Sequence, residues 1–367
     1  MQNGELFFNF NEKVIFSLRS LYASHGYAPY KMSKFEEYDL YARNKDFLIS
    51  DSVITFTDTS GKLMALKPDV TLSIIKNTAD TPSALQKVYY NENVYRISKG
   101  NHAYKEIMQA GLECFGEIDN YQLCEVITLA AKSLTAVSDA CVLDISHLGL
   151  LENVFESFAV PAFARAQLLT YIGEKNVHDL VKYSKEIGMK PEDTEALTAL
   201  VSAAGAPQTV IPALKAALQG KVDTAPLAQL EAVLSAVDAK LLPMIRLDFS
   251  VVNDMNYYSG IVFKGFIEGI PASILSGGQY DNLMQKMNRR SGAVGFAVYL
   301  DLLERFGYTP SEYDCDIVLT YTDADDLKAL NAYVSTLTES GKSVLVCKEI
   351  PKHTKCREQI SFNSEVK

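Results

Sequence analysis

The sequence lacks several features that would assign it to a familiar class. It has six cysteines but no Cys-x-x-Cys pair, and only His353 and Cys356 stand close enough to share a metal. We therefore expect no metal site and no disulfide framework, and the thiols should be reduced. No run of 18 apolar residues is present, which excludes a membrane-spanning helix. The segment Met1–Glu5 has neither a basic nor an apolar stretch typical of a signal peptide, so a cytoplasmic protein is expected.

Positive charge is also scarce. The 35 Lys and Arg residues are outnumbered by 45 Asp and Glu, which gives a net charge of −10. This balance argues against a protein whose main task is to bind a phosphate backbone. The chain has 367 residues, of which 48% are hydrophobic, so it can build two or three domains with substantial cores.

The pattern along the chain changes twice. Mixed helical and strand patterns give way to an Ala- and Leu-rich helical stretch, after which strands return and a glycine-rich turn is expected at Ser276-Gly-Gly278. The last section is expected to be a strand, a helix, a strand and a short tail. The predicted divisions are a first core segment at 1–147, a helical insertion at 148–243, a second core segment at 244–310 and a small α/β unit at 311–367.

A carboxylate and a hydroxyl stand two residues apart where a strand gives way to a helix, in Leu66-Lys-Pro-Asp-Val-Thr71. Here Asp69 and Thr71 can both face a cavity and together hold an ammonium group. The carboxylate would supply charge and the hydroxyl would accept a hydrogen bond. The alternative is that one of them simply caps the following helix.

The strand predicted over residues 107–116 carries polar side chains on one face. Because side chains alternate between the two faces of a strand, Gln109, Gly111, Glu113 and Phe115 point the same way. Gln and Glu within an apolar strand are typical of a pocket floor, where Gly111 leaves room for a ligand. The alternative is a sheet face exposed to solvent.

Two adjacent tyrosines occur in Asn253-Asp-Met-Asn-Tyr-Tyr-Ser-Gly260. One phenol can face a pocket while the other packs in the core. Taken alone, the segment is explained equally well by an aromatic core beside a turn.

Together these segments resemble class II aminoacyl-tRNA synthetases, and within them the histidyl-tRNA synthetase family, over roughly residues 5–145 and 244–306. Leu66–Thr71 resembles the family's Leu-Arg-Pro-Glu-Gly-Thr, and Arg96 falls on its motif 2 arginine. Asn253–Tyr258 aligns with its signature Arg-Gly-Leu-Asp-Tyr-Tyr. Two further segments match in order, Ser276–Asp281 with Gly-Gly-Arg-Tyr-Asp and Gly292–Ala297 with motif 3.

The resemblance implies an α+β fold, in which an antiparallel sheet flanked by helices carries a helical insertion and a small C-terminal α/β unit. It also implies a histidine pocket whose α-amino subsite is formed by Asp69, Thr71 and Gln109. Glu113 and Tyr258 would contact the imidazole nitrogens. The histidine-binding residues implied are Asp69, Thr71, Arg96, Gln109, Glu113, Tyr257 and Tyr258.

The departures from the family concern the cations that hold ATP. The signature arginine is replaced by Asn253, and the motif 3 arginine by Leu302. Because removing one positioned electrostatic group costs about 10²–10³ in rate, we expect negligible adenylation. Ser33 replaces a motif 1 proline, where a homodimer interface is expected. The C-terminal unit looks truncated, and its acidic residues 323–326 argue against a tRNA partner.

A chain that keeps histidine contacts and loses ATP and tRNA contacts resembles the regulatory subunit of short-form ATP phosphoribosyltransferase, the first enzyme of histidine biosynthesis. The resemblance implies no catalysis and no cofactor. It implies a hetero-octamer with the short catalytic subunit, which the chain would activate and through which L-histidine would exert feedback inhibition. The alternatives are an active histidyl-tRNA synthetase, an amino-acid-binding module with another partner, and a degenerate relative without a ligand.

Overall fold

The computed structural model describes residues 10–44, 53–81, 83–98, 102–252, 257–303 and 312–362. The chain divides into two compact units. Of the described residues, those within 14–303 form the larger unit, and 10–13 together with 312–362 form the smaller one. No helix within the described ranges is long and apolar enough to cross a lipid bilayer.

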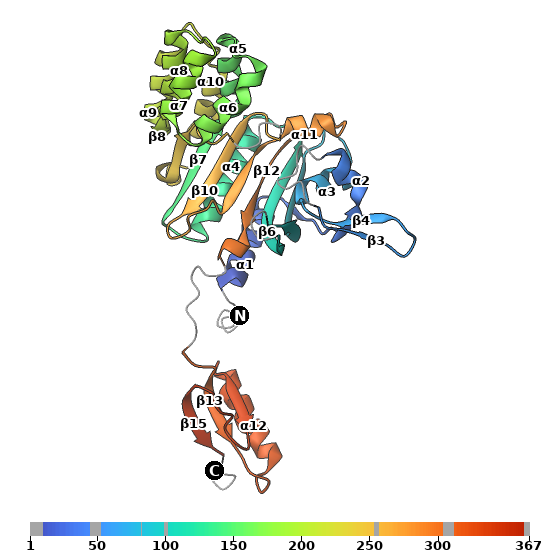
Figure 1. The fold of residues 1–367 in the computed structure, drawn as a ribbon. Coiled ribbons are helices and arrows are strands. Elements are labelled where there is room, and N and C mark those ends of the chain that lie inside the picture. Colours follow the sequence, from blue (N-terminus) through green and yellow to red (C-terminus); the bar gives the residue numbers. More distant parts are fainter. Residues whose placement is uncertain are drawn as a thin grey trace. The chain divides into compact units, whose positions relative to one another are not determined.

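A nine-stranded sheet forms the centre of the larger unit, with helices packed on it (Figure 1). Its spatial order is β1-β5-β6-β12-β11-β10-β7-β9-β8. The β1–β5 and β7–β9 pairs are parallel, and the remaining neighbours are antiparallel. In chain order the strands are β1 (Ala28–Pro29), β5 (Gln86–Ile97), β6 (Tyr104–Gly116), β7 (Cys141–His147), β8 (Ala204–Gly205), β9 (Ile245–Asp248), β10 (Ile261–Ile267), β11 (Leu275–Gln279) and β12 (Gly292–Tyr299).

Helix α4 illustrates how local sequence sets these elements. Asp119 caps it by accepting hydrogen bonds from the backbone of Tyr121 and Gln122, while the Gln122 side chain bonds the Asp119 backbone. Its buried side, which includes Leu129, packs against β7, β10 and β12. Most of α1 (Phe10–Ser24) belongs to the larger unit. The other helices of this unit outside the insertion are α2 (Tyr38–Arg43), α3 (Val70–Asn77), α4 (Asn120–Thr135), α11 (Asp281–Lys286) and the short 3₁₀ helix η3 (Leu300–Leu303).

A second, three-stranded sheet leads directly into α3. Its order is β2 (Phe35–Glu37), β4 (Leu63–Leu66), β3 (Thr55–Thr57), and all pairs are antiparallel. The hairpin predicted over residues 53–66 is confirmed. It turns at Gly61, whose φ of 84° lies in the left-handed region that suits glycine.

The Ala- and Leu-rich stretch forms six helices that gather at one end of the sheet (Figure 1). It also contributes β8, which pairs with β9 at the sheet edge. The predicted division at 148–243 as a domain of its own stays a prediction. The helices are α5 (Leu148–Ser157), α6 (Ala162–Gly173), α7 (Val177–Glu186), α8 (Pro191–Ser202), α9 (Pro207–Leu218) and α10 (Ala225–Ser235), followed by the 3₁₀ helix η2 (Leu242–Met244).

The turn expected at Ser276-Gly-Gly278 is wrong, because these residues lie in strand β11 between β10 and β12. The glycines serve close packing instead. A Cβ at Gly277 would lie 2.4 Å from the carbonyl oxygen of Gly295, and one at Gly278 would lie 2.6 Å from that of Ile261.

The smaller unit contains a parallel three-stranded sheet with one helix. Strand β13 (Cys315–Thr320) lies between β14 (Val344–Cys347) and β15 (Cys356–Ser361), and α12 spans Leu327–Glu339. Its small core includes Ile317, Leu319 and Leu330. The expected short tail is therefore partly a third strand. The acidic residues just before the helix act locally, because Asp326 caps α12 through the backbone N–H groups of Lys328 and Ala329.

Candidate functional site

A pocket opens where β6, β11 and β12 meet the start of α3 and the tyrosine pair. The empty space inside it is about 510 Å³, a figure that includes the solvent at its open mouth. All seven residues that the sequence predicts as histidine-binding line it, namely Asp69, Thr71, Arg96, Gln109, Glu113, Tyr257 and Tyr258. Histidine binding by these residues stays a prediction.

Asp69 both caps a helix and faces the pocket. The Leu72 backbone N–H donates to its Oδ1 at 2.9 Å, so the alternative that this residue caps the following helix is confirmed as well. Burial raises the pKa of the Asp69 carboxyl, and the nearby Arg96 opposes that shift. A cationic group entering the pocket would meet a carboxylate that is poorly solvated and already fixed in orientation.

Strand β6 supplies the pocket floor, as expected from side-chain alternation. Gln109 and Glu113 are buried and line the cavity. Gly111 does not leave room for a ligand directly, because a Cβ there would lie 2.5 Å from the Tyr90 hydroxyl oxygen. The space above Gly111 is taken by this phenol, which itself lines the pocket.

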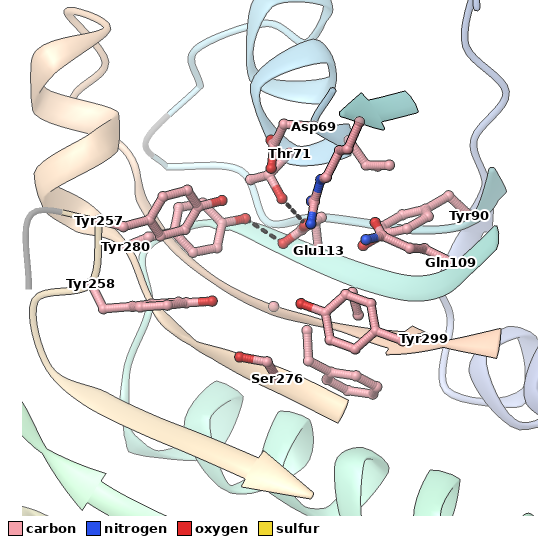
Figure 2. A pocket seen from close by; sticks show the side chains of 15 residues that line it. Asp69, Thr71, Tyr90, Gln109, Glu113, Tyr257, Tyr258, Ser276, Tyr280 and Tyr299 are labelled. Carbon is pink, nitrogen blue, oxygen red and sulfur yellow. Dashed lines mark hydrogen bonds between the residues drawn. The ribbon is translucent and has the colours of Figure 1, made fainter. Parts of the chain in front are cut away.

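Glu113 is held by two hydroxyls from distant parts of the chain. Thr71 Oγ1 donates to Oε1 at 2.7 Å, and the Tyr280 hydroxyl donates to Oε2 at 2.5 Å (Figure 2). Burial raises the pKa of Glu113 to about 8, and the negative charge of Asp69 adds to the shift. The carboxyl group can therefore exchange a proton near neutral pH.

Aromatic rings form much of the pocket wall. The rings of Tyr257 and Tyr258 are 4.7 Å apart between centroids, and those of Tyr257 and Tyr280 are 5.7 Å apart. Tyr299 lies opposite, and Figure 2 shows its hydroxyl directed toward that of Tyr258 across the cavity. These walls suit a flat, partly polar ring.

Four polar lining residues were not predicted from the sequence. Tyr280 lies in the segment Ser276–Asp281 that carries the family resemblance, so this motif could have indicated it as a pocket residue. Tyr90 and Tyr299 enter through strand register, since Tyr90 pairs with Gly111 and Tyr299 with Gln109. That register is a property of the assembled sheet. The four residues are Tyr90, Ser276, Tyr280 and Tyr299.

Positive charge is scarce in the pocket. Among the described lining residues, Arg96 is the only Lys or Arg, and its Nε donates to the Pro68 carbonyl at 3.2 Å. Gln279 is uncharged, and its Oε1 accepts a hydrogen bond from the Ile261 backbone N–H at 2.9 Å. Leu302 lies in η3, whereas Asn253 lies outside the described residues.

Comparison with known proteins assigns the chain to a family. The sequence profile of the histidyl-tRNA synthetase family matches residues 7–303. The chain belongs to this family. Within it, an ATP phosphoribosyltransferase regulatory subunit of Oceanobacillus iheyensis is 30% identical over 298 residues. That match covers 79% of this chain and 72% of the relative, so the chain belongs with these regulatory subunits, whose name describes regulation rather than catalysis.

Solved structures share the fold. An ATP phosphoribosyltransferase regulatory subunit/histidyl-tRNA synthetase from Bacillus halodurans superposes with a TM-score of 0.81 at 20% identity, covering 96% of this chain and 93% of that one. The ATP phosphoribosyl transferase (HisG:HisZ) complex from Thermotoga maritima contains a chain that matches with a TM-score of 0.64 at 18% identity, covering 80% and 97%. The predicted class II synthetase-like fold of this family is thereby confirmed.

Proposed function

We propose that the chain is the non-catalytic regulatory subunit of an ATP phosphoribosyltransferase and binds histidine in the pocket around Glu113. Through this pocket it would activate the short catalytic subunit and convey feedback inhibition. The observation that carries the proposal is the grouping of acidic and hydroxyl side chains, Asp69, Thr71 and Glu113, within an aromatic-walled cavity.

The chemistry of the cavity favours a histidine-like ligand over most amino acids. Asp69 offers a carboxylate for the α-ammonium group, and Gln109 can serve as a further acceptor. Glu113 at the floor offers an acceptor for a ring N–H, and tyrosine rings can contact the ring faces. A ligand without ring N–H would leave the buried Glu113 without its added partner, which is costly.

The residues at the positions where adenylation needs cations support the proposal that the chain has no catalytic activity. Charge that develops on ATP phosphates must be met by positioned cations. Arg96 remains, but Asn253 and Leu302 stand where the family has arginines, and Gln279 bonds the backbone instead. A pocket whose described lining has Arg96 as its one Lys or Arg suits a free amino acid better than a nucleoside triphosphate.

A partner is supported by the names of the relatives. A regulatory subunit acts on a catalytic chain, and the Thermotoga maritima structure is a complex of two kinds of chain, HisG and HisZ. We extend this to an assembly with a short catalytic subunit, a hetero-octamer, in which the chain also contacts its own copy through the synthetase-like core. Allostery in that assembly requires that histidine bind two states with different affinity.

The direct experiment is reconstitution with a short catalytic subunit. We expect the mixture to form a stable complex and to convert ATP and phosphoribosyl pyrophosphate faster than the catalytic subunit alone. L-Histidine should reduce that rate, and Glu113→Gln should relieve the inhibition while leaving complex formation intact. Absence of both complex and activation would contradict the regulatory role.

A further inference from the structure

Two cysteines of the smaller unit begin neighbouring strands. Cys315 is the first residue of β13, Cys356 is the first residue of β15, and the two are register partners in this parallel pair. Register partners in a parallel pair point to the same face of the sheet, and their strands lie about 4.7–4.9 Å apart. This spacing falls within the range of about 4.4–6.8 Å between Cα atoms that disulfide bonds span.

The backbone just before the two cysteines holds the strand starts together. The Asp314 backbone N–H donates to the Lys355 carbonyl at 2.8 Å, and the Lys355 backbone N–H donates to Asp314 Oδ2 at 2.9 Å. Because β15 lies at the edge of the sheet, its first residue can shift toward β13 without displacing another strand. Only a small shift is needed, since a disulfide requires Cβ atoms about 3.5–4.5 Å apart.

The state of the two thiols is compatible with bond formation. Neither cysteine is in a disulfide, and both are partly exposed. Burial raises the pKa of the Cys315 thiol, and the nearby Cys356 adds to that shift. The two sulfur atoms therefore lie within electrostatic reach of each other. A disulfide between them would remove the repulsion that arises when both thiols are ionised.

The remaining thiol of the smaller unit, Cys347, is placed differently. It ends β14 and is the register partner of Thr320. Because Thr320 and Cys315 are an odd number of residues apart on β13, Cys347 and Cys315 point to opposite faces of the sheet. The other cysteines belong to the larger unit, namely Cys114, Cys124 and Cys141. The sheet of the smaller unit thus brings together Cys315 and Cys356.

We propose that Cys315 and Cys356 are a thiol pair that a small-molecule disulfide oxidises to a reversible cross-strand bond. One cysteine thiolate attacks a sulfur of the small molecule, which releases one small thiolate and leaves a mixed disulfide on the protein. The second cysteine thiolate attacks the protein sulfur of this mixed disulfide and releases the other small thiolate. The two cysteine protons pass to the released thiolates, so two cysteines are oxidised and one disulfide is reduced to two thiols.

The bond would fasten the edge strand β15. The side chains of Arg357, Glu358 and Gln359 are exposed, so the middle of this strand is held mainly by backbone pairing with β13. A covalent link at the start of the strand restricts the open states that this pairing allows. Oxidation should therefore slow amide hydrogen exchange in β15 by about tenfold or more. The inference does not rest on the function proposed for the pocket around Glu113.

The test treats the full, natively folded chain with oxidised glutathione, followed by alkylation of free thiols and peptide mass spectrometry. We expect a cross-linked peptide that joins Cys315 to Cys356 and that dithiothreitol separates again. Hydrogen exchange of the oxidised chain should show the slower exchange in β15. Cys315→Ser and Cys356→Ser should each retain one glutathione on the remaining partner, because the thiol that would displace it is gone.

Cys347→Ser is the matched control, because it removes a partly exposed thiol of the same sheet from the opposite face. It should leave the yield of the Cys315–Cys356 bond and the change in β15 exchange as in wild type. Free thiols at both positions after treatment, separate glutathione adducts on Cys315 and Cys356, or a bond from either to another cysteine would overturn the pair. Unchanged exchange in β15 after the bond has formed would overturn its role in fastening the strand.

Discussion

Gly295 of β12 lies directly against the carboxyl group of Glu113 in the neighbouring strand β6. A Cβ at Gly295 would fall 1.8 Å from Glu113 Oε2 and 2.5 Å from the Leu112 carbonyl oxygen. The two residues are register partners across the β6–β12 pair. The position of the pocket floor therefore depends on a glycine far along the chain.

Gly295→Ala should damage the pocket specifically. The added methyl group must displace Glu113 or separate two central strands, which we expect to cost about 1–3 kcal/mol of unfolding free energy. Histidine binding should be lost together with the contacts from Thr71 and Tyr280. Denaturant unfolding and calorimetric titration measure the two effects.

The matched control is Gly173→Ala, at the end of helix α6. A Cβ there would lie 3.4 Å from a Val252 side-chain carbon, an ordinary contact. This variant should bind histidine as wild type does and should lose little stability. Unchanged histidine affinity in Gly295→Ala would show that the ligand does not depend on Glu113.

Stability should depend on pH through Glu113. Its pKa is raised from 4.5 to about 8 on folding, so the folded chain keeps a proton that the unfolded chain releases. Between these values the unfolded state is favoured as pH rises, and stability falls. Melting temperatures of wild type between pH 5 and 8.5 should decline more steeply than those of Glu113→Gln. Parallel profiles for the two proteins would argue against the raised pKa.

The sequence predicted which residues line the pocket better than it predicted the strand register that brings them together. Asp69, Thr71 and Glu113 belong to motifs that can be identified from the types and order of residues in the sequence. The contact between Gly295 and Glu113, and the entry of Tyr90 and Tyr299, depend on strand register, which is fixed only when the sheet assembles.

The errors in the fold have related causes. The glycines of β11 resemble turn formers in the sequence, but in the sheet they let neighbouring strands approach closely. Strand β15 was expected to be a tail, because its side chains at 357–359 are exposed and give a weak apolar pattern. Local propensity does not reveal backbone pairing at a sheet edge.

A buried ion pair holds the chain two residues before Asp69. Lys67 is fully buried, and its Nζ lies 3.0 Å from Glu92 Oε2. Glu92→Gln would leave a buried ammonium without its counter-charge, and we expect a loss of about 3 kcal/mol in unfolding free energy. The combined Lys67→Met and Glu92→Leu variant should recover most of that loss, as denaturant titration can measure.

The exposed pair Lys62–Glu37 provides the comparison, because both side chains are about half exposed. Lys62→Gln should cost less than about 1 kcal/mol. Equal losses for the buried and exposed pairs would mean that Lys67 does not stabilise the segment before Asp69.

The chain should not activate histidine with ATP. The family resemblance of the sequence implies that Asn253 and Leu302 stand in place of two arginines, and each such group is worth about 10²–10³ in rate. Pyrophosphate exchange should therefore run at least about 10³-fold slower than in an active histidyl-tRNA synthetase assayed alongside. Exchange at a comparable rate would restore the synthetase interpretation.

The central claim is that the pocket around Glu113 recognises histidine. Calorimetric titration of the full chain with each of the twenty amino acids tests it most directly. Our account predicts saturable binding of L-histidine with one site per chain, at least about tenfold tighter than any other amino acid, and abolished by Glu113→Gln. Binding of L-histidine that Glu113→Gln leaves unchanged, or no binding at all, would contradict it.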